Sequence, residues 1–248
     1  MSKTKKYLDF YIKSSIHVGL AVFSLVQLSF TQLNSYAFLV FFGTIVGYNF
    51  LKYLKWFRFK NVFDKKVIAI LSVSLLASIV CVLLFYRQEY YIQIHLFIAL
   101  LLVVLYPNVR KIGWIKPFFV AFVVTFITVY IPLMNHEEVI VIYLQRFLLL
   151  SSVMIPFEIL DSTTDSVALK TLPHWFGIQR TKQMGYVLVV LFCVVSFHAL
   201  DCLYPCLIYA LSSVVAIYFS SVKRSWYYTL LWVESLPVFW LLISIVFQ

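Results

Sequence analysis

Residues 139–165 read VIVIYLQRFLLLSSVMIPFEILDSTTD. Residues 139–159 form an apolar run of the length that an α-helix needs to cross a bilayer, which is about 20 residues. Three carboxylates, Glu158, Asp161 and Asp165, stand at its end. Their spacing of three and four residues places them on one face of a helix. Acids at a membrane edge are costly and usually functional, and a metal ion holding a phosphorylated ligand would use them.

The remainder of the chain continues this apolar pattern. It has 248 residues, of which 63% are hydrophobic and 12% charged, and its mean hydropathy is +0.94. A soluble domain cannot bury that much apolar surface. We therefore expect one all-α, polytopic membrane domain over residues 1–248. The predicted spans, nine in all, lie near residues 14–31, 36–54, 67–86, 90–106, 117–134, 139–159, 184–200, 203–221 and 227–247.

The basic residues indicate which side of the membrane each loop occupies. With the N-terminus inside, 18 of the 20 lysines and arginines fall on the inside, and only Arg87 and Arg146 do not. This asymmetry predicts a cytoplasmic N-terminus and an outside C-terminus, in a membrane of the bacterial inner-membrane type. The net charge of +10 does not indicate a nucleic-acid partner, because the bases form short clusters between apolar spans.

One segment of the chain resembles a known family. Glu158, Asp161 and Asp165, followed by Lys170-Thr-Leu-Pro173 and then Gly177, are similar to the second aspartate-rich motif of the UbiA superfamily of intramembrane prenyltransferases. The resemblance implies a nine-helix transmembrane bundle whose active site opens to the cytoplasm. It also implies transfer of an isoprenyl group from an isoprenyl diphosphate to a lipophilic acceptor, with an aromatic acceptor expected. Asp161 and Asp165 would be catalytic ligands of Mg²⁺, with Glu158 supporting them.

The first motif of that family is degenerate in this chain. The family pattern N-D-x-x-D falls on Asn49-Phe50-Leu51-Lys52-Tyr53, so the asparagine is present and both acids are missing. The resemblance implies a catalytic role for Asn49 and substrate contacts for Lys52 and Tyr53. A positive charge at Lys52 opposes binding of a second divalent ion and favours a phosphate oxygen. We therefore expect a single Mg²⁺ ion.

Weaker signals surround these two motifs. Tyr106 and Arg110 resemble a family signature of a tyrosine followed by bases, and with Lys170 they are candidate substrate contacts; an interfacial tyrosine and topology-determining bases explain the pair about as well. Glu234 stands where the family often has an acid, although carboxylates also suit helix N-termini. Arg146, inside a predicted span, indicates either a polar partner or a side chain that reaches the outside surface.

Other features favour packing over chemistry. The four cysteines form no C-x-x-C pair, and the five histidines lack metal-ligand spacing. Gly43 and Gly47, four residues apart, favour close approach of a neighbouring helix.

The principal alternative to an enzyme is a non-catalytic protein of the same fold that binds a prenyl or polyprenyl lipid, and loss of the first acidic motif supports it. A transporter is less favoured, because few charges lie deep within the spans.

The charge asymmetry predicts the topology directly. A reporter fused after Gln248 should report the outside, whereas one inserted near Lys60 should report the inside. A third reporter beside Arg87 should agree with the first. Finding the Gln248 and Lys60 reporters on the same side would contradict an odd number of spans.

Overall fold

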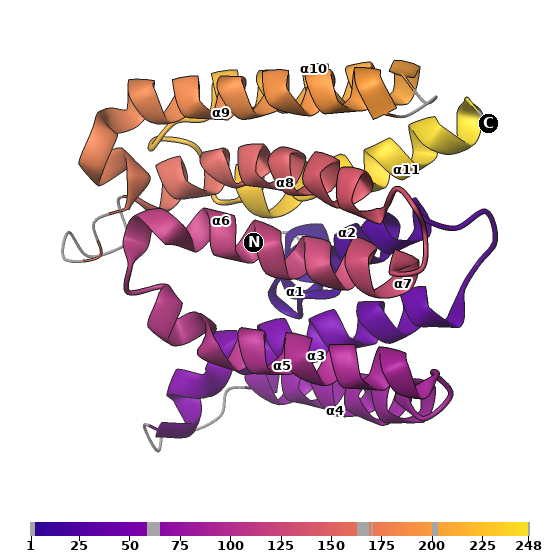
Figure 1. Cartoon of the computed structure of the whole chain (residues 1–248). Helices are drawn as coiled ribbons and strands as arrows, with labels where there is room; N and C mark the ends of the chain where they lie inside the picture. The colour runs from indigo at the N-terminus through magenta and orange to yellow at the C-terminus, as the bar shows by residue number, and fades with distance from the viewer. Residues whose placement is uncertain (1–2, 59–64, 163–168, 170, 200–202, 248) are drawn as a thin grey trace.

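The computed structural model describes residues 3–58, 65–162, 169, 171–199 and 203–247. Within these residues all regular structure is helical, and no strand is present. In Figure 1 the helices lie side by side, with α9 and α10 along one side, α3 to α5 along the other, and α2, α6, α8 and α11 between them.

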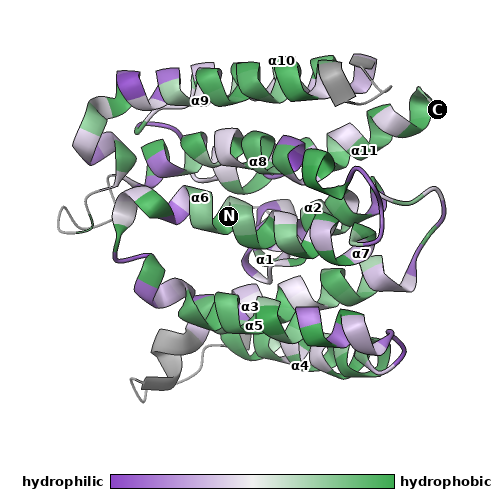
Figure 2. Ribbon diagram, viewed as in Figure 1, coloured by the Kyte–Doolittle hydropathy of each residue, from purple (hydrophilic) through white to green (hydrophobic). Residues whose placement is uncertain are grey.

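The helices follow one another with short connections. In order they are α1 (Lys3–Lys13), α2 (Ile16–Gln27), α3 (Ser35–Arg58), α4 (Lys65–Phe85), α5 (Tyr90–Val109), the 3₁₀ turn η1 (Gly113–Ile115), α6 (Lys116–Thr125), the π-helix η2 (Phe126–Tyr130), α7 (Ile131–Leu133), α8 (Val139–Asp161), α9 (Leu172–Ala199), α10 (Leu203–Phe219), the π-helix η4 (Tyr228–Val233) and α11 (Leu236–Val246). Figure 2 shows apolar residues along most of their length and hydrophilic residues gathered toward their ends.

The protein is a multi-pass membrane protein. Among the described residues, six helical segments are long and apolar enough to cross a membrane, or seven if the bent pair α1–α2 counts as one span. Each of the nine stretches expected from hydropathy coincides with helical structure, but α2 has 12 residues and α10 has 17. A straight helix needs about 20 residues to span the hydrocarbon core. The nine-span count therefore stays a prediction.

The first predicted span is interrupted near its start. Ser15 adopts a left-handed backbone conformation, with φ of 62°, and separates α1 from α2. The two helices meet at 57°. A non-glycine residue rarely adopts this conformation, and the tertiary contacts that hold it in place come from α3, as described below.

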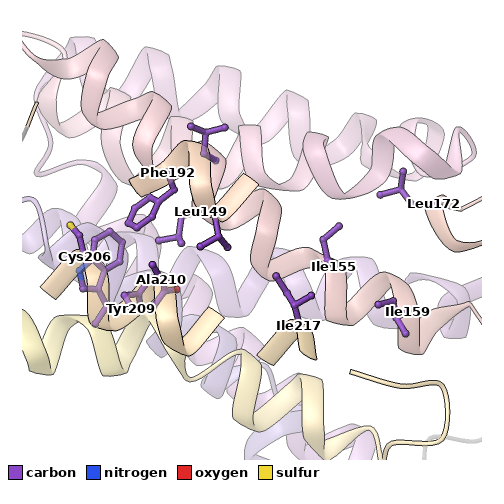
Figure 3. Close-up of a cluster of buried hydrophobic side chains, with 12 residues drawn as sticks. Leu149, Ile155, Ile159, Leu172, Phe192, Cys206, Tyr209, Ala210 and Ile217 are labelled. Atoms are coloured by element: carbon purple, nitrogen blue, oxygen red, sulfur yellow. The ribbon is translucent and has the colours of Figure 1, made fainter. Parts of the chain in front are cut away.

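The main hydrophobic core lies between α8, α9, α10 and α11. Figure 3 shows the labelled side chains of this core on α8, α9 and α10, and Trp240 adds to it from α11. A second cluster packs α2 against α3 and η2, with Val26 and Ala37 fully buried. By contrast, Ala99 is the single buried residue of α5, as expected for a helix whose surface faces lipid.

Two glycines permit the closest helix contacts. A Cβ added at Gly185 on α9 would lie 3.0 Å from Cδ1 of Ile217 on α10 and 3.2 Å from Cγ1 of Ile155 on α8. At Gly19, an added Cβ would lie 3.1 Å from Cγ1 of Ile45. Gly47 does not have this role, because an added Cβ there meets no atom within 4 Å. Close approach therefore occurs at Gly19 and Gly185 instead of at the Gly43–Gly47 pair.

Gly185→Ala should destabilise the protein, whereas Gly47→Ala should not. The new methyl group at residue 185 has to displace two β-branched side chains, and overpacking of this kind costs about 1–3 kcal/mol. The melting temperature of the purified protein in detergent measures the difference. Equal melting temperatures for the two variants would mean that α9 approaches its neighbours less closely than described.

Candidate functional site

A lysine joins two of the three acids quoted at the start. Lys116 Nζ lies 3.1 Å from Glu158 Oε1 and 3.1 Å from Asp161 Oδ2. Lys116 is the first residue of α6, and both acids lie in the last turn of α8. Lys116 and Glu158 are buried, at 8% and 2% exposure, whereas the Asp161 side chain is 42% exposed. The ammonium group thus neutralises a buried carboxylate and anchors a second one that is open to its surroundings.

Tyr106 lies beside this ion-paired group. It interacts electrostatically with Lys116, Glu158 and Asp161, and also with Arg110, the residue that ends α5. Its ring stacks on Phe119 of α6, with ring centroids 6.4 Å apart and planes inclined by 20°. The ends of α5 and α8 therefore meet the start of α6 at one end of the bundle, on the left in Figure 1. We call this the carboxylate end.

Asn49, for which the sequence analysis expects a catalytic role, ties three helices together. Its Oδ1 accepts a hydrogen bond of 2.7 Å from Ser15 Oγ, at the break between α1 and α2. Its Nδ2 donates to the Ser14 carbonyl at 2.9 Å and to Ser74 Oγ on α4 at 2.8 Å. Asn49 is buried, at 3% exposure. In this structure its amide holds the helix break in place; the catalytic role expected of it stays a prediction.

Lys52 and Tyr53 meet the same helix break. Lys52 Nζ and the Tyr53 hydroxyl donate to the Lys13 carbonyl, the last of α1, at 3.4 Å and 3.2 Å. These bonds satisfy a carbonyl that the end of a helix leaves without an intrahelical partner. Lys52 is exposed, and its charge also interacts with Glu234. The two expected substrate contacts thus lie beside α1 and an acid of the last span.

α1 is also fastened to the loop before η4. Tyr227 donates a short hydrogen bond to Asp9 Oδ1, and this bond to a carboxylate raises the pKa of the Tyr227 phenol. The Lys13 ammonium lies 5.7 Å from the centre of the Trp226 ring. These contacts bring the start of the chain to the start of its last apolar segment.

Glu234 follows the π-helix η4, and π-helical turns occur often at functional sites. Glu234 is half-buried. Nearby, His17 Nε2 lies 3.0 Å from the Leu231 carbonyl, and His17 Nδ1 lies 2.9 Å from the Tyr11 hydroxyl. The break between α1 and α2 therefore packs directly on η4.

Tyr48 connects the two groups of polar residues. It interacts electrostatically with Glu234 on one side and with Tyr106 on the other. The side chains of both groups come from α3, α5, α6, α8 and the residue after η4, and Tyr48, which is 39% exposed, lies within electrostatic range of both groups. We call this set of side chains the polar cluster; its members are Tyr48, Lys52, Tyr106, Lys116, Glu158, Asp161 and Glu234.

The structure gathers some of the expected site residues and leaves others outside. Asp165 and Lys170 lie outside the described residues. Within the described part of the chain, no group of three or more histidine, cysteine or acidic side chains is arranged to hold a metal ion. Carboxylate oxygens such as those of Glu158 and Asp161 suit Mg²⁺, but Lys116 already bridges them. The fit to a metal is therefore partial here, with Asp165 needed as a third ligand.

Lys116 is the residue that sequence reasoning missed. It counts among the inside bases that explain the topology, and nothing in its neighbourhood links it to acids 42 and 45 positions later. The available signal is its place directly before Pro117, since proline favours the first turn of a helix. A base there begins the apolar segment instead of belonging to the loop.

Comparison of the chain with protein-family models, with curated proteins and with solved structures found no match. The resemblance to UbiA prenyltransferases therefore rests on the motif residues themselves.

Replacing Lys116 should show how much the ion pairs with Glu158 and Asp161 contribute to the stability of the protein. Removing one partner of a buried ion pair costs about 3–5 kcal/mol, because the other charge is left without compensation. Lys116→Met should therefore lower the melting temperature strongly, and the double variant Lys116→Met/Glu158→Gln should recover part of the loss.

Lys111→Met is the matched control, since Lys111 is exposed and its ammonium contacts Asn108 on the surface. A double-mutant cycle on thermal unfolding measures the coupling. If the effects of the Lys116 and Glu158 changes on stability are strictly additive, the interaction between the two side chains contributes nothing to the free energy of unfolding.

Proposed function

We propose that the protein is a membrane-embedded prenyltransferase, which moves an isoprenyl group from an isoprenyl diphosphate to a lipophilic acceptor, with an aromatic acceptor favoured. The observation that carries the proposal is the convergence of the polar cluster at one end of an apolar bundle. An amphiphilic substrate with a charged head and a long apolar tail needs that combination. The UbiA-like motif around Asp161 supports the same reaction.

The polar cluster has side chains suited to the diphosphate head. Lys116 and Lys52 supply positive charge, and Arg110 interacts with the same tyrosine as Lys116. When the C–O bond of the donor breaks, the electron pair leaves with the diphosphate, and cationic groups stabilise that developing charge. The allylic cation that remains is attacked by the acceptor, which then loses a proton.

Aromatic rings stand beside these charges. Tyr48 and Tyr106 belong to the polar cluster, and Phe119 stacks on Tyr106. The face of an aromatic ring attracts a cation, so these rings are suited to shelter the allylic intermediate and to exclude water from it.

In the proposed enzyme a single Mg²⁺ ion would be held by Asp161 and Asp165, with Glu158 in support. Such an ion neutralises charge on the leaving diphosphate. Lys116, which pairs with Glu158 and Asp161, would contribute a second positive charge. Lys52 would replace part of the missing first acidic motif by contacting the donor directly.

The second candidate is a non-catalytic protein that binds a prenyl or polyprenyl lipid. One observation favours it: Asn49, Lys52 and Tyr53 all bond to residues at the break between α1 and α2. The remnant of the first motif thus has a structural role that requires no substrate. A binder would keep the apolar bundle and the polar cluster and lack turnover.

Diphosphate release from isoprenyl diphosphates of several chain lengths, with Mg²⁺ and the purified protein, tests the proposal. The wild type should release diphosphate, and Asp161→Asn or Asp165→Asn should abolish turnover while the melting temperature stays close to that of the wild type. Glu138→Gln, an acid at the opposite end of α8, is the matched control and should keep full activity.

Unchanged turnover in both aspartate variants would remove the motif from the mechanism. Mass spectrometry of lipids that co-purify with the protein separates the two candidates. An aromatic compound carrying a prenyl chain supports the enzyme, whereas an intact polyprenyl lipid without any diphosphate release supports the binder.

A further inference from the structure

Arg146 is buried inside the bundle, far from the carboxylate end. It lies on α8, seven residues after Val139, which is about 10 Å along the helix at 1.5 Å per residue. The residue is 6% exposed, so its side chain does not reach the surface, and the sequence-based alternative of a snorkelling arginine is not what the structure shows. Its guanidinium carbon lies 3.8 Å from the centre of the Trp240 ring on α11.

The hydrogen-bond donors of Arg146 are not satisfied. Both Nε and Nη1 are buried without an acceptor. Among the described residues, the acids in ion pairs are Glu158 and Asp161, and both of these pair with Lys116. The Trp240 ring attracts the positive charge, but it does not replace a hydrogen-bond acceptor for the N–H groups.

A second buried donor lies beside the arginine. Tyr209 on α10 is completely buried, its hydroxyl has no hydrogen-bond partner, and it interacts electrostatically with Arg146. Its ring stacks on Trp240 with centroids 4.6 Å apart. Figure 3 shows Tyr209 with Phe192 and Cys206 at one end of the core, away from Ile159 and Leu172. The Trp240 ring thus contacts both Arg146 and Tyr209, the two side chains whose hydrogen-bond donors lack acceptors.

Within the part of the chain that the structure describes, no acidic side chain pairs with Arg146. The arginine side chain is always protonated in proteins and has five N–H donors and no acceptor. Taking such a charge out of water without a counter-ion is strongly unfavourable, and hydrogen-bonded anions are the usual remedy. A tyrosine hydroxyl beside it offers a further donor to the same partner.

We propose that Arg146 and Tyr209 form a binding site for a small monovalent anion of the chloride class. With Arg146 at 6% and Tyr209 at 0% exposure, a halide fits the proposal better than a diphosphate or a lipid headgroup, because both are larger. Arg146 lies seven residues after the start of α8, about two helical turns from that end. The site is separate from the polar cluster and does not depend on the proposed function.

Replacing gluconate by chloride at constant ionic strength tests the site in purified wild-type protein. Chloride should raise the melting temperature in a saturable manner, as expected for a ligand that binds only the folded state. Bromide should quench a saturable part of the tryptophan fluorescence, and that part should be lost in Trp240→Phe. Tyr209→Phe should weaken chloride binding about tenfold or more, as for loss of one hydrogen bond to an ion.

Arg146→Gln should abolish both responses, whereas Arg87→Gln, which changes the other base assigned to the same side of the membrane, should leave them intact. A wild-type melting temperature that is insensitive to chloride would overturn the proposal, whether or not any variant folds. So would an unchanged chloride response in a folded Arg146→Gln protein. Stabilisation by vesicles of anionic phospholipid, without any response to chloride, would assign the arginine to a lipid headgroup instead.

Discussion

The pairing of Lys116 with Glu158 and Asp161 is the interaction on which the carboxylate end depends. A carboxylate that is 2% exposed within an apolar bundle is tolerated because an ammonium lies 3.1 Å away. The same lysine starts α6, so the pair also fixes how α6 meets α8. Charge neutralisation and helix packing are therefore one requirement at this end of the molecule. Toward the other end of α8, Arg146 lies on the Trp240 ring, and two of its nitrogen donors have no acceptor there.

The helical segments follow from hydropathy, because apolar runs of membrane-spanning length are local in sequence. Contacts between distant segments do not. No glycine or proline at Ser15 predicts the break between α1 and α2. The break is held by a hydrogen bond to Asn49, which is 34 residues away. Sequence reasoning read Asn49 as a remnant of a catalytic motif, whereas the structure gives it three bonds to neighbouring helices. Such a role depends on tertiary structure and leaves no local pattern.

The candidate site was predictable in part for the same reason. Glu158, Asp161 and Tyr106, three residues that the sequence analysis singled out, lie within electrostatic range of one another, and Tyr48 lies within range of both Tyr106 and Glu234. Lys116 and its bridging position were not predictable, since a lysine before an apolar segment resembles any inside base. The polar cluster has two halves, and each contains both signs of charge. In one half the acids on α8 pair with a lysine on α6, and in the other Lys52 on α3 interacts with Glu234. The half at the carboxylate end thus has two acids and one lysine, which leaves an excess negative charge before any ligand binds.

The hydrogen bonds of Lys52 and Tyr53 limit how this chain can evolve. Both side chains donate hydrogen bonds to the Lys13 carbonyl. An ionised acid at either position has no hydrogen to donate, so its carboxylate oxygens would face the carbonyl oxygen, which is also an acceptor. An acid at either position would therefore require another way of satisfying the last carbonyl of α1, and a single substitution of this kind is expected to give a less stable protein.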